Sequence, residues 1–221
     1  MNAFLDTNIA IAKVFQFNSL HLKSKHVFES YSNLFWSAFV EKEFDKRYFK
    51  KNIHISKFFH DLQLFLENPL QEFYSCDDLL NFAQKNYDNK MKDDAVSSIK
   101  PFWDIYFELE TQIPFFRMKN TLNFCLRDLS LNSNSNKLNL KSIMQLTPQR
   151  TEDYPQIDEA LKLDGVHDDD RKVVLDGHDF ACNIKIPVDF VSFDDDCFKG
   201  ASNVKSLCFH SVKGRDDFNA S

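Results

Sequence analysis

The sequence predicts an α/β protein built on a central parallel sheet of four to five strands, in a three-layer α/β/α arrangement. Near both ends of the chain, short apolar runs alternate with segments of helical periodicity, which is the pattern of parallel strands joined by crossover helices. Acidic residues directly follow two of the predicted strands. Sheets of this kind place their sites outside the carboxyl ends of the strands. We therefore expect an acidic site at one edge of the sheet.

The first two predicted strands are short and each leads into a helix. Residues 2–5 form a mostly apolar run that ends at Asp6, and apolar residues recur at helical spacing over residues 9–15. A second apolar run at residues 34–37 precedes another helical pattern, and Glu43 falls in the first turns of that helix. Asp6 is thus expected at the carboxyl end of a strand.

The middle of the chain predicts a large all-helical insertion from about residue 53 to residue 160. Apolar residues recur at helical spacing as far as residue 131, and no strand is evident. Pro69, Pro101 and Pro114 divide the region into three or four helices, because proline begins or ends a helix more readily than it continues one. The polar run at residues 132–136 predicts a flexible loop, and residues 147–155 predict a second connection.

Alternating elements return in the last quarter of the chain. Residues 168–184 predict a helix, residues 188–193 a strand that ends at Asp194, and residues 204–209 a last strand. The expected organisation is a single domain over residues 1–212 that contains the insertion, followed by a tail over residues 213–221.

The composition excludes several common classes of protein. Only 4 of the 221 residues are glycine, and neither GxGxxG nor GxxxxGK[ST] occurs, which excludes the commonest nucleotide-binding loops. The formal net charge of −6 means that nucleic acid would bind only through a local basic surface or bound cations. The chain starts without a basic region and has no stretch approaching about 18 apolar residues. We expect a cytoplasmic protein without membrane association.

The five cysteines predict reduced thiols in the core. They are Cys76, Cys125, Cys182, Cys197 and Cys208. Their number is odd, they are widely scattered, and none forms a CxxC pair, so the pattern indicates neither a disulfide framework nor a zinc knuckle.

Acidic residues after predicted strands fit a site for divalent cations. Mg²⁺ and Mn²⁺ prefer hard oxygen ligands, and cleavage of a phosphodiester needs several carboxylates to hold such cations. Carboxylates gathered without a cation repel one another, so they have little structural use. A single Asp after a strand is more often the N-cap of a helix. The acidic runs at residues 168–170 and 194–196 also fit first turns favoured by the helix dipole.

Several motifs together resemble those of the PIN domains. Residues 4–8, Phe-Leu-Asp-Thr-Asn, resemble the LDTN motif that opens the family, in which the aspartate binds metal and the Asn supports it. This likeness points to Asp6 and Asn8. Residues 37–43 are similar to the family's segment of a serine, apolar residues and a terminal glutamate, which points to Glu43 and leaves Glu41 on another helical face. The likeness covers roughly residues 1–50 and 160–212.

The two remaining acids follow from the same resemblance. Residues 167–174 resemble the HxxDxxIL helix of archaeal members, whose register selects Asp170, with Asp169 as the competing choice. Residues 190–198 are similar to the closing [ST]xDxDF signature, which gives Asp194 as the fourth acid and Asp196 as an accessory one. Ser192 replaces the commoner Thr and keeps its supporting hydroxyl, and the next position holds Phe where many members have Asn.

The resemblance implies a metal-dependent endoribonuclease. Asp6, Glu43, Asp170 and Asp194, with Asp196, would bind Mg²⁺ or Mn²⁺, and phosphodiester bonds of an RNA substrate would be hydrolysed. PIN domains include the toxins of toxin–antitoxin pairs, which often dimerise. The resemblance therefore also suggests an antitoxin protein and a second copy of the chain as partners.

A cluster of basic residues follows Glu43 and has two readings. Lys46, Arg47, Lys50 and Lys51 could contact the RNA backbone, with aromatic residues between them to stack on bases. The same spacing equally fits a solvated helix face with Phe44 and Phe49 in the core.

Two other classes compete with the nuclease. A haloacid-dehalogenase-type phosphatase would need a second Asp two residues after Asp6, where the chain has Asn8. A non-catalytic PIN-like scaffold that binds RNA or protein remains the alternative, although such relatives have lost acids that this chain keeps.

Overall fold

The computed structural model describes residues 1–67 and 72–218. The chain divides into two compact units. The first, which we call the sheet unit, comprises Met1–Lys13, Leu20–Lys46 and Asn139–Ser221. The second, the helical unit, comprises Val14–Ser19 and Arg47–Leu138.

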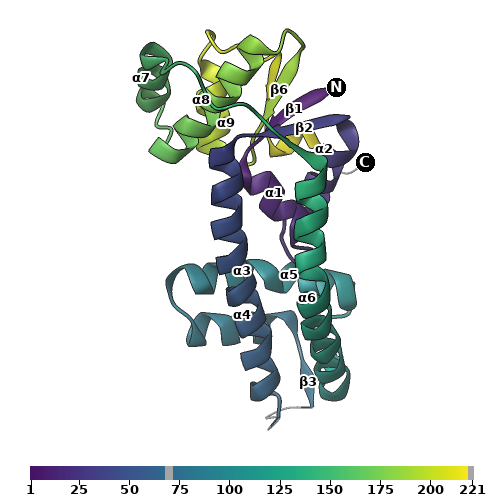
Figure 1. Ribbon diagram of the computed structural model, residues 1–221. Helices are drawn as coiled ribbons and strands as arrows, with labels where there is room; N and C mark the ends of the chain where they lie inside the picture. The colour runs from purple at the N-terminus through teal and green to yellow at the C-terminus, as the bar shows by residue number, and fades with distance from the viewer. Residues whose placement is uncertain (68–71, 219–221) are drawn as a thin grey trace. The chain divides into compact units, whose positions relative to one another are not determined.

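The sheet unit is built on a five-stranded sheet in the order β5-β2-β1-β6-β7. Its strands are β1 (Asn2–Leu5), β2 (Asn33–Trp36), β5 (Met144–Leu146), β6 (Val188–Val191) and β7 (Ser211–Lys213). Every neighbouring pair is parallel, with β1 between β2 and β6 at its centre (Figure 1). The predicted α/β class and parallel sheet are confirmed.

Helices cover both faces of this sheet. Side chains alternate along a strand, so Phe4 of β1 and its register partners Phe35 and Phe190 share one face. Phe180 of α8 (Asp168–Asn183) packs there, 4.7 Å from Phe35 between ring centroids. On the other face, Trp36 lies 5.5 Å from Phe44 of α3 (Ala38–Phe65). Burial from both sides explains why the central strands are mostly apolar. The exception is the buried Asp189 of β6, which accepts a hydrogen bond from the Tyr31 hydroxyl at 2.9 Å.

Four shorter helices and one 3-10 helix complete the sheet unit. They are α1 (Thr7–Val14), α2 (His21–Ser30), α7 (Pro155–Leu163), α9 (Asp195–Asn203) and η1 (Arg215–Phe218). Phe218 is buried, so the predicted tail from residue 213 contains the end of β7 and a packed turn of helix. Among the described residues, no helix is long and apolar enough to cross a membrane.

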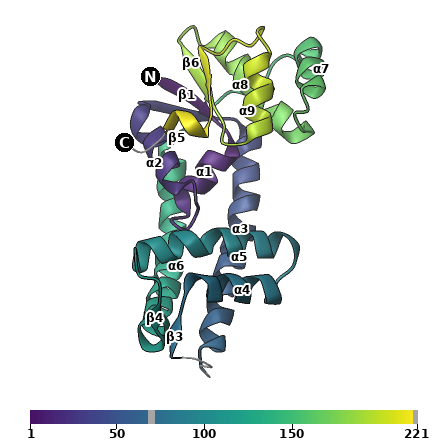
Figure 2. The ribbon, with the colours of Figure 1, turned by 180° about the vertical axis from the view of Figure 1, so that it is seen from behind.

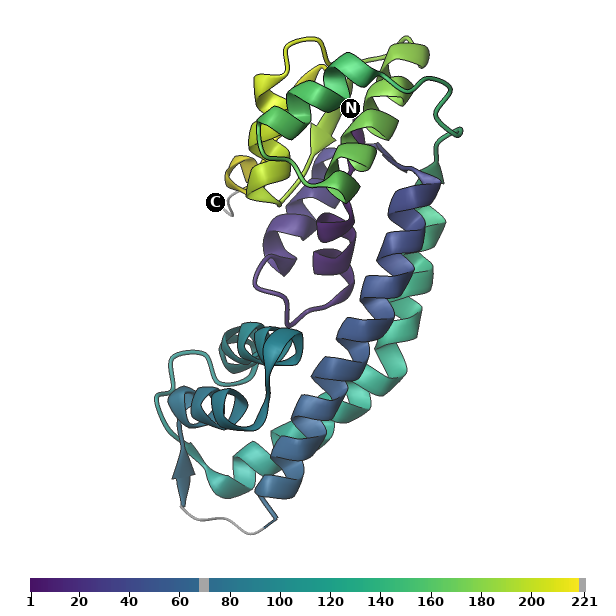
Figure 3. The ribbon, with the colours of Figure 1, turned by 90° about the vertical axis from the view of Figure 1, so that its left-hand side faces the viewer.

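The helical unit has a core of aromatic side chains. It contains α4 (Cys76–Asn86), α5 (Asn89–Tyr106), most of α3 and most of α6 (Phe115–Ile143). Figure 2 shows α4 and α5 against each other, and Figure 3 shows α3 and α6 as long continuous helices. Phe59 and Phe102 are fully buried, with ring centroids 5.0 Å apart.

Two expectations about this middle region are wrong. The expected all-helical insertion at 53–160 contains the two-residue strands β3 (Phe73–Tyr74) and β4 (Ile113–Pro114), and β5 of the main sheet also falls within it. Pro101 lies inside α5 rather than at a helix end. Pro114 lies in β4 and directly precedes α6, so it separates two helices as expected. Pro69 lies outside the described residues.

The predicted loop at residues 132–136 is also wrong, because α6 runs through it. Leu129, Ser133 and Leu140 are buried and lie on one helical stripe. Ser133 is small enough to continue that stripe where a polar run seemed to break it. Burial of one face therefore overrides the low helix propensity of Asn and Ser.

The predicted last strand at residues 204–209 is displaced to β7, which starts at Ser211. The apolar side chain of Phe209 packs against the sheet, although its backbone is not part of a strand. Phe209 stacks on Phe190 with centroids 5.0 Å apart, whereas the backbone pairing with β6 is made by Ser211–Lys213.

Candidate metal centre

Asp6 lies at the carboxyl end of β1 and is almost fully buried, with 2% of its surface exposed. Its backbone N–H donates to Val191 O at 3.0 Å, which joins the ends of β1 and β6. Its carboxylate Oδ2 accepts hydrogen bonds from Ser192 Oγ at 2.9 Å and from Asn8 Nδ2 at 3.2 Å. Parallel strands end at the same edge, so Asp6 and Ser192 meet although 186 residues separate them.

Ser192 also connects Asp6 to Asp194. The Ser192 hydroxyl accepts the Asp194 backbone N–H at 3.1 Å while donating to Asp6. Asp194 is the N-cap of α9, because its Oδ1 accepts the N–H groups of Asp196 at 3.1 Å and Cys197 at 3.0 Å. Asp194 is therefore an N-cap, as one of the two interpretations predicted, and only its Oδ1 is used for capping.

Asp170 belongs to the same neighbourhood through the buried thiol of Cys197. Burial raises the pKa of the Cys197 thiol well above its usual range, and the negative charges of Asp6, Asp170 and Asp194 raise it further. The charges of Asp6, Asp170 and Asp194 therefore all act on the same thiol.

The two acids that precede Asp170 in the chain form ion pairs with basic residues of α8. Asp169 is exposed and pairs with Lys172 at 2.9 Å, and Asp168 pairs with Arg171 at 2.9 Å. Asp170 itself is only half exposed. Of the three acids at the start of α8, Asp170 is the one whose charge acts on Cys197.

Glu43 is tied to the same edge of the sheet through Thr7. The Thr7 hydroxyl donates to Glu43 Oε2, and Thr7 directly follows Asp6 and is fully buried. Glu41 lies on another face of α3, where it accepts from Lys141 Nζ at 2.9 Å. Sequence reasoning missed Thr7, although its place next to Asp6 in the motif was a usable signal.

The carboxylates are suitable ligands for a hard cation, but their oxygen atoms do not form a compact cluster. Over residues 1–67 and 72–218, the one trio of His, Cys, Asp or Glu side chains whose ligand atoms all lie within 4.8 Å is His178, Cys182 and Cys208. The acids stand further apart, as like charges do without a cation. Carboxylate and hydroxyl oxygens are nevertheless the donors that Mg²⁺ and Mn²⁺ prefer. Asp196 is exposed on the first turn of α9.

Only three of the four residues of the predicted basic patch are exposed. Lys46, Arg47 and Lys50 are exposed on α3. Lys51 is not, because its side chain is 14% exposed and lies 4.0 Å from Asp94, and burial lowers the pKa of its ammonium group. Lys51 is therefore less accessible to RNA than Lys46, Arg47 and Lys50.

The rings in that patch divide between core and surface. Phe44 and Tyr48 are buried, which removes them from any stacking surface, whereas Phe49 is 68% exposed. The alternative that placed Phe49 in the core is therefore also wrong.

A second polar group at the carboxyl edge of the sheet was not expected. Ser37 follows β2, and Thr147 follows β5 and donates its N–H to Trp36 O at 2.9 Å. Burial raises the pKa of Asp176 in α8, while a hydrogen bond with Ser37 and the charge of Arg150 oppose this rise. The Arg150 Nε lies 3.7 Å from Asp176 Oδ1. Nothing in the spacing of these residues indicated that they would meet.

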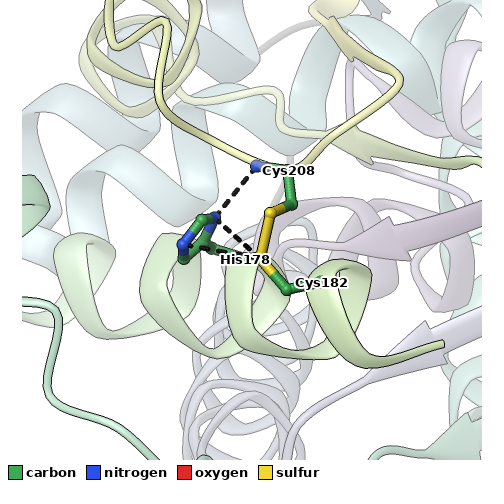
Figure 4. A group of neighbouring side chains, drawn as sticks. All are labelled: His178, Cys182 and Cys208. Carbon is green, nitrogen blue, oxygen red and sulfur yellow. Dashed lines mark hydrogen bonds between the residues drawn. A yellow bond between two sulfur atoms is a disulfide. The ribbon is translucent and has the colours of Figure 1, made fainter. Parts of the chain in front are cut away.

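Two of the five cysteines are not the reduced core thiols that were expected. Cys182 and Cys208 are exposed and form a disulfide, next to His178 (Figure 4). Cys125 and Cys197 are free and buried, and Cys76 is free and half exposed. The bonded pair is 26 residues apart and joins a helix to a loop, so spacing alone could not reveal it.

No protein-family model matches the chain, and neither a curated protein nor a solved structure matches it. What the geometry defines is an α/β protein whose parallel sheet gathers acids at its carboxyl edge. Its function is therefore argued from these side chains.

Proposed function

We propose that the protein is a metal-dependent endoribonuclease with a PIN-like fold, in which Asp6, Glu43, Asp170 and Asp194 hold Mg²⁺ or Mn²⁺. One observation carries this proposal: the Ser192 hydroxyl donates to Asp6 and accepts the Asp194 N–H, so acids from the two ends of the chain meet at one edge of the sheet. Acids from distant segments repel one another when they share one neighbourhood. A shared cation would offset this repulsion, in addition to the cap that Asp194 provides for α9.

A divalent cation bound by these acids would supply Lewis acidity toward the phosphodiester and a source of hydroxide at neutral pH. The chain's own residues orient the ligands. Ser192 and Asn8 both donate to Asp6 Oδ2, which fixes the orientation of this carboxylate. Capping α9 takes Oδ1 of Asp194, so Oδ2 is the oxygen that it offers. The Thr7 hydroxyl donates a hydrogen bond to Glu43 Oε2 and so orients the Glu43 carboxylate.

RNA is the substrate that we propose, with the exposed cations Lys46, Arg47 and Lys50 as contacts to its backbone. A cytoplasmic location is part of this proposal. A role as the toxin of a toxin–antitoxin pair, with an antitoxin protein and a second copy as partners, is part of the same proposal and rests on the likeness of motifs alone.

The test is cleavage of a labelled structured RNA in the presence of Mn²⁺, with EDTA as the metal-free control. We expect cleavage by the unaltered chain, and loss of about a hundredfold or more in rate for Asp170→Asn. Asp169→Asn is the matched control, because it removes the neighbouring exposed acid by the same substitution. Circular dichroism establishes that both variants are folded.

Two outcomes would contradict the proposal. Equal cleavage by the unaltered chain and the Asp6→Asn, Asp194→Asn double variant would mean contamination or a different site. Metal-independent RNA binding without any cleavage would favour the non-catalytic scaffold instead.

A further inference from the structure

The first half of α6 has an exposed face on which aromatic and basic side chains are interleaved. Phe116 is 72% exposed and Phe124 is 61% exposed. Phe116, Asn120 and Phe124 recur every four residues, so they lie on one face of the helix. Arg117 and Arg127 are exposed on the same face. Two rings, an amide and two cations therefore point to solvent together.

A surface pocket of about 470 Å³ lies against this face, entirely within the helical unit. Phe116, Asn120 and Phe124 line it from α6. Tyr106 at the end of α5 also lines it, with its ring centroid 6.2 Å from that of Phe124 and its ring nearly perpendicular, at 80°. Among the described residues that line the pocket, Arg117 alone is charged. Mostly apolar walls with a few polar groups are typical of a ligand site.

The side chains of this pocket match the chemistry of an unpaired nucleobase. Every base has a flat face that stacks on an aromatic ring, whatever the nucleotide sequence. The Asn120 amide has both donors and an acceptor, as the edges of the bases do. A groove for an apolar helix of another protein is expected to be lined by aliphatic side chains. No Ile, Leu or Val is among the described residues that line this pocket.

The charge of this part of α6 also suits nucleic acid. Its first half has three basic residues, Arg117, Lys119 and Arg127, and one acid, Asp128, although the net charge of the whole chain is −6. Arg117 donates to both carboxylate oxygens of Glu110, at 2.6 Å and 2.7 Å, so its charge is partly neutralised. We therefore expect stacking to contribute more to binding than contacts with phosphate do.

We propose that this face of α6 binds unpaired bases of single-stranded RNA. Bases stack on the rings of Phe116 and Phe124, Asn120 contacts a base edge, and Arg127 contacts a backbone phosphate. The choice of RNA rests on the proposed nuclease function. The binding of bases does not, because it needs neither a metal ion nor any acid of the metal site.

The first experiment measures binding of the full chain to a fluorescent oligoribonucleotide of adenosines by anisotropy, in EDTA so that no cleavage occurs. We expect Phe116→Leu and Phe124→Leu each to weaken binding roughly fivefold or more, because leucine stays apolar but has no ring on which a base can stack. Phe124→Trp should retain the affinity. Leu131→Ala is the matched control and should bind normally, because Leu131 is also 61% exposed on α6 but does not line the pocket.

The second experiment varies the ligand and the salt concentration. The deoxyadenosine oligonucleotide should bind within a few-fold of the RNA strand, whereas a fully paired RNA duplex should bind at least roughly tenfold more weakly, because its bases are already stacked. Raising the KCl concentration from about 50 mM to about 200 mM should weaken binding of the single strand by less than roughly tenfold, as expected for one or two phosphate contacts.

Circular dichroism establishes that the variants are folded, which the exposure of both rings favours. Unchanged binding by folded Phe116→Leu and Phe124→Leu variants, or equal binding of the duplex and the single strand, would overturn the proposal. An effect of Leu131→Ala as large as that of Phe124→Leu would also overturn it and would indicate an apolar docking surface instead. Ring-dependent binding in EDTA without any cleavage in Mn²⁺ would leave this inference standing while the nuclease proposal fails.

Discussion

At the scale of single residues, Ser192 is the centre of the proposed site. It is fully buried, donates to Asp6 and accepts the Asp194 N–H, so one hydroxyl fixes two of the four acids. Groups that orient metal ligands matter almost as much as the ligands themselves. The serine is also where the motif departs from the commoner threonine, and both side chains carry the hydroxyl that these two bonds require.

Ser192→Ala is expected to lower the rate of RNA cleavage by roughly ten- to hundredfold, because the carboxylates of Asp6 and Asp194 lose their common anchor. It also leaves the buried Asp6 with one hydrogen bond fewer, which costs about 1–3 kcal/mol in the free energy of unfolding. Cleavage assays and urea unfolding measure the two effects. Ser192→Thr is the control, and a loss of activity as large as in Ser192→Ala would show that the hydroxyl is not what matters.

At the scale of elements, α8 has the most demanding position. Its Gly177 lies against the central strand, where an added Cβ would stand 2.9 Å from Cδ1 of Phe4 and 3.1 Å from Phe209. Phe4 is fully buried and stacks on Phe190, so it has little room to shift. Close approach of α8 to β1 therefore depends on glycine, and this packing carries Asp170 toward the edge of the sheet.

Gly177→Ala is expected to lower the free energy of unfolding by about 1–2 kcal/mol. The contact with Phe4 costs more than the helix gains from replacing glycine, which is about 1 kcal/mol. Urea unfolding followed by circular dichroism measures the change. Phe4→Leu combined with Gly177→Ala provides the control, because a smaller side chain relieves the contact and the two losses should not add. Full additivity would contradict this account of the packing.

The elements differ in how far the sequence reveals them. β1 and β6 are predicted within one or two residues, because each is a buried apolar run that ends at the acidic edge. β7 is not, because Phe209 is apolar for packing on Phe190 while the pairing residues start at Ser211. The acids near Asp6 were predictable from their motifs. The Cys182–Cys208 bond and the Arg150–Asp176 contact were not, since each depends on how distant segments fold together.

At the scale of the whole molecule, a bound cation would couple the two ends of the chain. Asp6 and Glu43 come from the first two segments of the sheet unit, and Asp170 and Asp194 from the last. Without a cation, the repulsion among these carboxylates opposes the closure of the sheet unit. A ligand that binds only the folded state stabilises it by mass action. Folding stability should therefore report metal binding without any assay of activity.

Mn²⁺ at about a hundredfold excess over its dissociation constant is expected to raise the free energy of unfolding by about 2.7 kcal/mol. Thermal unfolding at increasing Mn²⁺ concentration measures this effect, with K⁺ at matched ionic strength as the control for general screening. The Asp6→Asn, Asp194→Asn double variant should lose the Mn²⁺ effect. Its own stability in the absence of metal should rise or stay unchanged, because two repelling charges are gone. Asp169→Asn should keep the full effect, and an equal Mn²⁺ shift in the double variant would place the cation elsewhere on the molecule.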